Sequence, residues 1–322
     1  MANSILTPTA VTREALRVLH QKLNFVGSIT RDYDDSFAKS GAKIGDSLKI
    51  RLPNQYVVRS GATLSAQDTT ETSVTLQVAT QKGVDLNFTS TDLTLSLDDF
   101  SKRIIEPAMS VLAANIEYDA MTMYKDVYQS VWNGGSAVTL AKVLAGRKIL
   151  QDALAPLNAR TANLNTQDNV DLVDSLKGLF NDTTNISKQY REGYMGRTAG
   201  FDFMENTMWP AHTRGGSNGA YLTNGATQSG STLVVDTGAT APAAGDVITI
   251  AGVFKVHPET KVSTGILQQF VVGAGATTTS FPISPAIVAT GATQNVSNTA
   301  ADNSAITFLG TASTAVGTSL LY

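Results

Sequence analysis

The first hydrophobic pattern along the chain has helical spacing. Between about residues 9 and 24, apolar side chains recur every three or four positions, as they do on the buried face of an amphipathic helix. The residues that carry this pattern are Val11, Ala15, Leu16, Val18, Leu19 and Leu23. We therefore predict a helix over this range.

The period then becomes alternating. Leu48, Ile50 and Leu52 alternate with polar residues, and Pro53 follows them, which predicts a strand that stops at the proline or lies at a sheet edge. A second alternating stretch has its apolar positions at Val74, Leu76, Val78, Val84, Leu86 and Phe88. Two long strands around a polar tip predict a hairpin-like arm that reaches away from the body. An ordinary meander packed on the core fits the same pattern equally well.

The longest helical pattern lies between residues 97 and 131. Ser96 and Asp99 form a weak capping box at its start, and Asn133-Gly134-Gly135 marks its end. The apolar positions are Phe100, Ile104, Ala108, Leu112, Ile116, Met123, Val127 and Val131. We predict one spine helix of about 50 Å, at 1.5 Å per residue, that is bent or interrupted at Pro107. Two shorter helices are predicted over about 138–154, where Pro156 follows, and over about 169–180, capped by Asp168 or Asn169.

After about residue 214 the chain is poor in charge and rich in Gly, Ala, Ser and Thr, and its apolar runs shorten to strand length. The runs cover 233–235, 247–250, 253–256, 266–272, 280–283 and 306–309. Ala251-Gly252 is predicted to form a two-residue hairpin turn between the second and third runs. Short strands with Gly-rich turns predict a small antiparallel barrel or sandwich, and with the preceding helices this gives an α+β fold class.

Composition narrows the classes of function. The 322 residues are enough for two domains, and a net charge of −3 argues against a surface that binds nucleic acid electrostatically. The absence of cysteine excludes disulfides and thiolate chemistry. The first residues lack the basic and apolar regions of a signal peptide, and no apolar run approaches the roughly 18–20 residues of a membrane span. We expect a protein made and kept in a cytoplasm, with no membrane partner.

Residues that could carry chemistry are few and scattered. His20, His212 and His257 have no second ligand at metal-binding spacing, so we interpret them as packed or solvated. Asp98-Asp99 favours the positive end of the long helix, and Asp34-Asp35 lies in a polar loop. No nucleotide-binding loop or nucleophile elbow is present. We predict no enzyme activity, no cofactor, and no catalytic or metal-binding residue.

The densest charged cluster in the central part of the chain is interleaved with aromatic residues. Arginine next to tyrosine is typical of protein interfaces, although a solvated loop over a core strand fits as well. The candidate intersubunit residues are Lys188, Tyr190, Arg191, Glu192, Tyr194 and Arg197.

Three stretches make the chain similar to a known family. Residues 165–182 (NTQDNVDLVDSLKGLFND), residues 186–206 (ISKQYREGYMGRTAGFDFMEN) with the following Pro210–Thr213, and residues 251–272 (AGVFKVHPETKVSTGILQQFVV) resemble the coat proteins of short-tailed phages of the P-twenty-two type. The resemblance spans nearly the whole chain and is looser in the first hundred residues. It implies the capsid fold of tailed phages, with an N-terminal arm, an extended loop, a peripheral domain with a spine helix, an axial domain and an inserted antiparallel β-barrel.

The resemblance implies the following division of the chain. The arm covers 1–30, the extended loop and the start of the peripheral domain 31–95, and the spine helix 96–137. The axial domain covers 138–221, the inserted barrel 222–300, and residues 301–322 return to the axial domain. Family members continue beyond this point, so we expect the axial domain to be incomplete, by truncation or by a different closure of the fold. The last residues, Ser319–Tyr322, have the apolar character of the start of a strand.

The implied function is that of a major capsid protein. Copies would assemble into pentamers and hexamers of an icosahedral shell, with scaffolding and portal proteins as partners and double-stranded DNA enclosed without sequence-specific contacts. The protein would be assembled in the bacterial cytoplasm and would end in the virion. An encapsulin-like nanocompartment is an alternative, although such shells lack the inserted barrel. A tail or adhesin protein is a further alternative, suggested by the Thr/Gly/Ala-rich part and disfavoured by the long helix.

Overall fold

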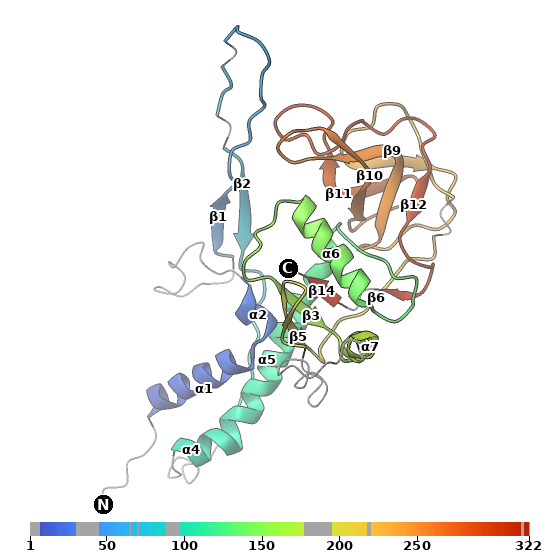
Figure 1. The fold of residues 1–322 in the computed structure, drawn as a ribbon. Coiled ribbons are helices and arrows are strands. Elements are labelled where there is room, and N and C mark those ends of the chain that lie inside the picture. Colours follow the sequence, from blue (N-terminus) through green and yellow to red (C-terminus); the bar gives the residue numbers. More distant parts are fainter. Residues whose placement is uncertain are drawn as a thin grey trace, which may run out of the picture. The chain divides into compact units, whose positions relative to one another are not determined.

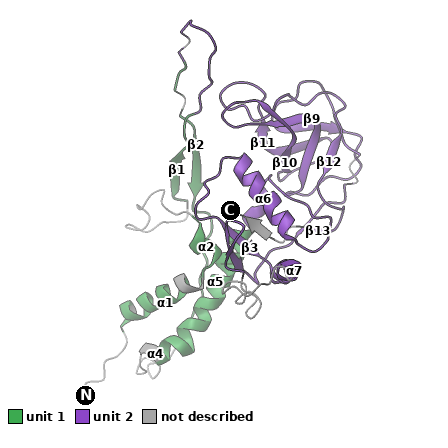
Figure 2. Ribbon diagram, in the orientation of Figure 1, with its two compact units in different colours: residues 1–54, 67–121 green, residues 55–66, 122–322 purple. Residues whose placement is uncertain are grey.

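The computed structural model describes residues 7–29, 45–64, 66–69, 71–87, 97–176, 195–217, 220–316 and 319–321 (Figure 1). The chain divides into two compact units, coloured separately in Figure 2. Unit 1 comprises Met1–Asn54 and Gln67–Met121, and unit 2 comprises Gln55–Ala66 and Thr122–Tyr322. Helices and strands occur in both units, so the predicted mixed α+β class is confirmed.

Helix α1 (Pro8–Lys22) confirms the first predicted helix of unit 1. The Thr7 hydroxyl accepts a hydrogen bond from the Ala10 N–H at 3.3 Å, and Pro8 stands at the first helical position, where its missing N–H costs nothing. The short helix α2 (Phe25–Ser28) follows. The buried Glu117 carboxylate accepts the Phe25 N–H at 3.1 Å, so α2 is tied to the long helix as well as packed against it.

The long helix is helical from residue 97 to residue 126 but not uniformly α-helical. It consists of α4 (Leu97–Phe100), a π-helical turn η2 (Ser101–Ile105), α5 (Glu106–Met121) and a 3-10 turn η3 (Thr122–Asp126). The Glu106 N–H bonds to the carbonyl of Ser101, five residues back. Pro107 has no N–H and its ring crowds the preceding turn, so the predicted junction at this proline is confirmed. The predicted helical end near 131 is wrong, because residues 127–139 form neither helix nor strand.

The two alternating stretches of unit 1 pair with each other. Strand β1 (Ser47–Arg51) runs antiparallel to β2 (Ser73–Gln77), from Ser47 opposite Gln77 to Arg51 opposite Ser73. The predicted hairpin is therefore confirmed between these strands. The second stretch does not continue as a strand over residues 84–87, and Phe88 lies outside the described residues.

A small mixed sheet and two helices form one part of unit 2. Its strand order is β14 (Ser319–Leu321), β3 (Thr161–Leu164), β5 (Phe201–Glu205) and β4 (Arg197–Thr198), with β3 and β5 parallel. Helices α6 (Leu140–Asp152) and α7 (Thr166–Leu176) confirm the two shorter predicted helices, although residues 177–180 lie outside the described part. The shared core consists of Val143, Ala162, Leu164, Leu172, Leu176, Met195, Phe201 and Phe203.

The C-terminal part of unit 2 is an antiparallel sheet that nearly closes into a barrel. Its strands are β7 (Leu222–Thr223), β8 (Gly230–Asp236), β9 (Val247–Val256), β10 (Ser263–Val272), β11 (Ser280–Ile287) and β12 (Ile306–Phe308), in the order β12-β9-β10-β11-β8-β7. Leu222 also bridges to Ala305, next to β12, and the Ile306 N–H bonds to the carbonyl of Tyr221 at 3.0 Å. These contacts join the two edges of the sheet around a core that contains the buried Tyr221 and Phe281 rings, 4.8 Å apart.

The hairpin turn predicted at Ala251-Gly252 is wrong. Strand β9 runs through both residues, and its hairpin partner is β10. Residues 249–254 of β9 oppose only 267–269 of β10, so the glycine lies in a bulge, with φ +81°. A bulge and a tight turn both need a residue that tolerates positive φ. The glycine in the sequence therefore does not distinguish one from the other.

Candidate functional site

The candidate intersubunit cluster is described at one position. Lys188, Tyr190, Arg191, Glu192 and Tyr194 lie outside the described residues. Arg197 lies on β4, with 61% of its side chain exposed and a guanidinium nitrogen 3.8 Å from the Asp202 carboxylate on β5. Its interface role therefore stays a prediction.

The two-stranded sheet of unit 1, β1 and β2, exposes apolar side chains. Every residue of β2 is exposed, and the pair forms a sheet of its own. Val74 is 52% exposed, Leu76 55% and Leu52, just after β1, 43%. We call Leu52, Val74 and Leu76 the apolar ribbon. An isolated two-stranded hairpin is marginally stable in water, so these side chains would gain from a partner surface.

Residues between the two strands are also apolar and exposed. Tyr56, Val57, Val58 and Leu64 belong to unit 2, and Val58 and Leu64 are almost fully open to solvent. Exposed apolar clusters of this kind are typical of interaction sites. The sequence predicts a polar tip, because the apolar residues in this segment have no clear period.

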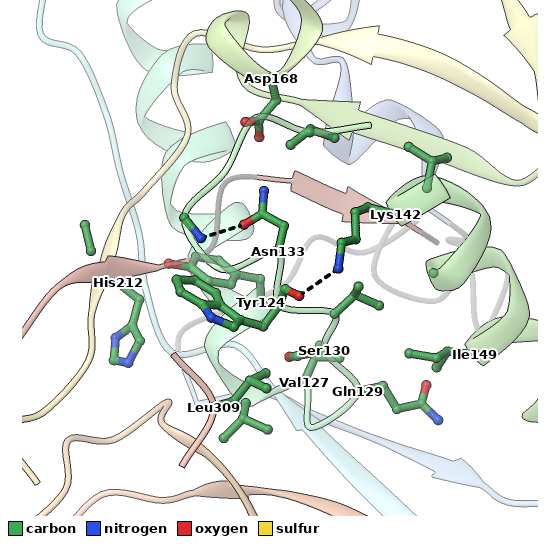
Figure 3. Close-up of a pocket in the computed structure, with 18 of the residues that line it drawn as sticks. Tyr124, Val127, Gln129, Ser130, Asn133, Lys142, Ile149, Asp168, His212 and Leu309 are labelled. Carbon is green, nitrogen blue, oxygen red and sulfur yellow. Dashed lines mark hydrogen bonds between the residues drawn. The ribbon is translucent and has the colours of Figure 1, made fainter. Parts of the chain in front are cut away.

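A cavity with a volume of about 520 Å³ lies within unit 2 (Figure 3). Its walls come from residues 124–138, from α6 and α7, and from the His212 and Leu309 region near the barrel. The Lys142 ammonium donates to the carbonyl of Trp132 at 3.3 Å, and the Asn133 side chain accepts the Gly135 N–H at 3.2 Å. These bonds fold the 132–136 segment over the cavity.

Two buried polar residues of this cavity, His212 and Asp246, bind each other. His212 Nε2 lies 2.9 Å from Asp246 Oδ1, and this carboxylate also accepts the N–H groups of Gly215 at 3.1 Å and Ala243 at 2.9 Å. Burial lowers the pKa of the neighbouring Arg214 guanidinium, while the Asp246 charge opposes that shift. The network joins residues 212–215 to the loop before β9. His212 is thus a packed residue that orders the chain.

The other titratable residues considered in the sequence lie in separate parts of the chain. His257 Nδ1 accepts the N–H groups of Glu259 and Thr260, both at 3.3 Å, and so shapes the turn between β9 and β10. His20 lies in α1, Asp98-Asp99 lies in α4, and Asp34-Asp35 is outside the described residues. Within the described ranges, no group of three or more His, Asp and Glu side chains is arranged to hold a metal ion.

No helix in the described part of the chain combines the length and the apolar character needed to cross a membrane. No protein-family model matches the chain, and no curated protein matches it either.

Two solved structures similar to this chain come from phage or coat-protein sources. A protein of Mycobacterium phage Che8 is 20% identical with a TM-score of 0.45, over 58% of this chain and 70% of that one. The CUS-3 coat protein I-domain is 30% identical with a TM-score of 0.24, over 29% of this chain and 96% of that one. Both TM-scores lie below 0.5, so neither likeness by itself establishes a shared fold.

Proposed function

We propose that this chain is a structural protein of a phage, the major capsid subunit that assembles into an icosahedral shell around double-stranded DNA. The observation that carries the proposal is the apolar ribbon, a paired hairpin whose side chains remain open to solvent. In a shell, a neighbouring copy would cover this hairpin. The order of elements supports the same reading, since helix, hairpin, long helix, small sheet and β-barrel follow one another as the family resemblance requires.

The shell would form through many weak contacts between identical subunits. Contacts of this kind are heterologous, and they close by rotation into pentamers and hexamers, with scaffolding and portal proteins as further partners. DNA would be enclosed by a mildly acidic wall that does not hold it. The barrel at residues 222–308 favours a phage coat protein over an encapsulin-like shell. The protein would assemble in the bacterial cytoplasm and would then form the virion capsid.

A double substitution in the apolar ribbon tests the proposal. Val74→Ser with Leu76→Ser removes apolar surface that the subunit leaves about half exposed, so we expect its own stability to change by less than about 0.5 kcal/mol per site. Burying the exposed half of each side chain in a contact is worth about 1 kcal/mol, or about 2 kcal/mol for the pair. That is roughly a 30-fold weaker contact.

The assay is negative-stain microscopy and sedimentation of the overexpressed protein, with its scaffolding protein present. We expect shells from the wild type and unassembled subunits from the double variant at the same concentration. The control is Val111→Ser, which changes a comparably exposed valine of α5. Normal shells from the ribbon variant, at an unchanged threshold concentration, would contradict the proposal.

Arg197→Ala tests the candidate cluster separately. The Arg197–Asp202 pair is exposed and long, so its loss should cost the subunit less than about 0.5 kcal/mol. We expect weaker assembly at nearly unchanged stability. If the loss of assembly in Arg197→Ala is fully explained by its loss of stability, Arg197 is not part of the interface.

A further inference from the structure

A second cavity of unit 2 lies between helix α6 and the bulged pair β9–β10. Its volume is about 470 Å³, within the range of about 300–1,000 Å³ typical of small-molecule sites. We call it the α6–β10 groove. It is lined by Tyr128, Gln129, Ala145, Lys148, Ile149, Asp152, Thr249, Lys255, Ile266, Leu267, Gln268 and Gln269.

The groove is a consequence of local geometry. Ala145, Lys148, Ile149 and Asp152 repeat at helical spacing and form one face of α6. The opposite wall is bent, because bulges interrupt the β9–β10 ladder between residues 263 and 269 of β10. A straight helix face cannot follow a bent strand pair closely, so a space remains between them.

The end wall of the groove is fixed by hydrogen bonds. The Gln269 amide accepts the Ser130 N–H at 2.9 Å through its oxygen and donates to the Ser130 carbonyl at 2.9 Å through its nitrogen. This two-way bond holds the Tyr128–Ser130 segment against β10. Gln268 is buried and donates to the backbone carbonyl of Gln269 at 2.9 Å. The groove is therefore preformed, which lowers the entropic cost of binding.

The chemistry of the groove combines apolar walls with one half-buried cation, Lys255. Ile149, Ile266 and Leu267 supply aliphatic surface, and Ile266 is 47% exposed. Burial lowers the pKa of Lys255, while Asp152 raises it and Lys148 lowers it further. Within the described ranges, no carboxylate lies within ion-pair distance of the Lys255 ammonium. Two lysines face one aspartate here, so the groove carries a net positive charge.

We propose that the α6–β10 groove binds an amphiphilic monocarboxylate, with the carboxylate at Lys255 and the hydrocarbon chain against Ile149, Ile266 and Leu267. An anion would provide the partner that the half-buried ammonium lacks, and such a charge-assisted bond is stronger at a partly desolvated group than in bulk water. An alkyl chain would take the apolar walls out of water. This site does not depend on the proposed shell function.

Calorimetric titration of the whole protein with dodecanoate tests the proposal. We expect saturable binding below the micelle-forming concentration. Dodecyltrimethylammonium, with the same chain and the opposite charge, should bind at least tenfold more weakly. Octanoate should bind more weakly than dodecanoate, because it buries fewer methylene groups. Equal affinity for the two chain lengths would assign the groove to a bare carboxylate, such as an acidic side chain of a protein partner, and would overturn the proposal.

Variants locate the binding in the groove. Lys255→Met should weaken dodecanoate binding at least tenfold, and Lys255→Arg should retain it. The matched control is Lys142→Met. It removes the charge of a lysine of helix α6 that lines the other cavity. Equal binding to wild type and Lys255→Met, or no saturable binding to wild type, would overturn the proposal. If Lys255→Met does not fold, the comparison of the two head groups on the wild type decides alone.

Discussion

Removal of the Asp246 carboxylate should destabilise unit 2 strongly. Asp246 is 2% exposed and accepts hydrogen bonds from the His212 ring and from the Gly215 and Ala243 backbone. In Asp246→Ala, the buried His212 ring and the part-buried N–H groups of Gly215 and Ala243 lose this acceptor. Each unsatisfied buried donor costs about 1–3 kcal/mol, so the three donors together account for a loss of several kcal/mol.

We therefore expect Asp246→Ala to lower the free energy of unfolding by about 3–5 kcal/mol. For a unit of this size, each kcal/mol corresponds to a shift in Tm of about 2–4 °C, so the midpoint should fall by about 6–20 °C. Asp246→Asn keeps one acceptor oxygen but turns an N–H₂ group toward donors, so it should lose about 2 kcal/mol. Urea and thermal unfolding followed by circular dichroism measure both variants.

The control for this series is Asp302→Ala. The Asp302 carboxylate accepts the Gly225 N–H at 2.8 Å in an exposed turn, where water can replace it, so the loss should stay below about 1 kcal/mol. A fall of less than about 1 kcal/mol for Asp246→Ala would refute the reasoning. It would mean that water enters the site, or that the 212–215 segment moves away without cost.

Two further predictions concern the pKa of Glu14 and the packing around Gly238. A hydrogen bond from Arg17, above all, lowers the pKa of Glu14 from 4.5 to about 2, so the Glu14 contribution to stability is complete above pH 4.5 and is lost as pH falls toward 2. The Tm difference between wild type and Glu14→Gln should accordingly shrink to zero across that window, and a constant difference would contradict this assignment. A Cβ at Gly238 would overlap the Tyr221 ring, so Gly238→Ala should cost about 1–3 kcal/mol or more in urea unfolding, whereas Gly83→Ala, with open space around it, should cost less than about 1 kcal/mol. Equal stability of the two alanine variants would show that the Tyr221 ring moves aside freely.

The parts of the fold that were predictable from sequence depend on local periodicity. Helix α1 and strand β1 each present one unbroken period, and their predicted bounds agree with the structure within a few residues. The second alternating stretch is predicted to run to Phe88, but it forms a strand only over β2. The end of the long helix was not predictable in this way, because Met123, Val127 and Val131 continue its spacing. Long-range contacts override that spacing: the Tyr124 ring stacks on Trp209 at 6.0 Å, and Gln269 binds the Ser130 backbone in both directions.

The candidate sites also differ in whether they have a local signal in the sequence. The cluster of charged and aromatic residues along the sequence predicts Arg197 as an interface residue without any knowledge of the fold, and this role stays a prediction. The apolar ribbon was visible only as part of a strand, because period alone does not tell which face of a hairpin is left uncovered. The α6–β10 groove had no local signal. Its walls come from Tyr128, from α6 and from residues 249–269 of β9 and β10, and only the tertiary structure brings them together.

The barrel begins and ends at neighbouring points of the molecule. Leu222 bridges to Ala305, and beyond them β6 (His212–Thr213) pairs with β13 (Ala315–Val316), so the two crossings of the chain run alongside each other. A segment whose ends already meet can be grafted into, or deleted from, a single surface loop with little change in loop-closure entropy for the host. Evolution can therefore exchange or lose this β-module in one genetic event, while the remaining chain keeps its connectivity.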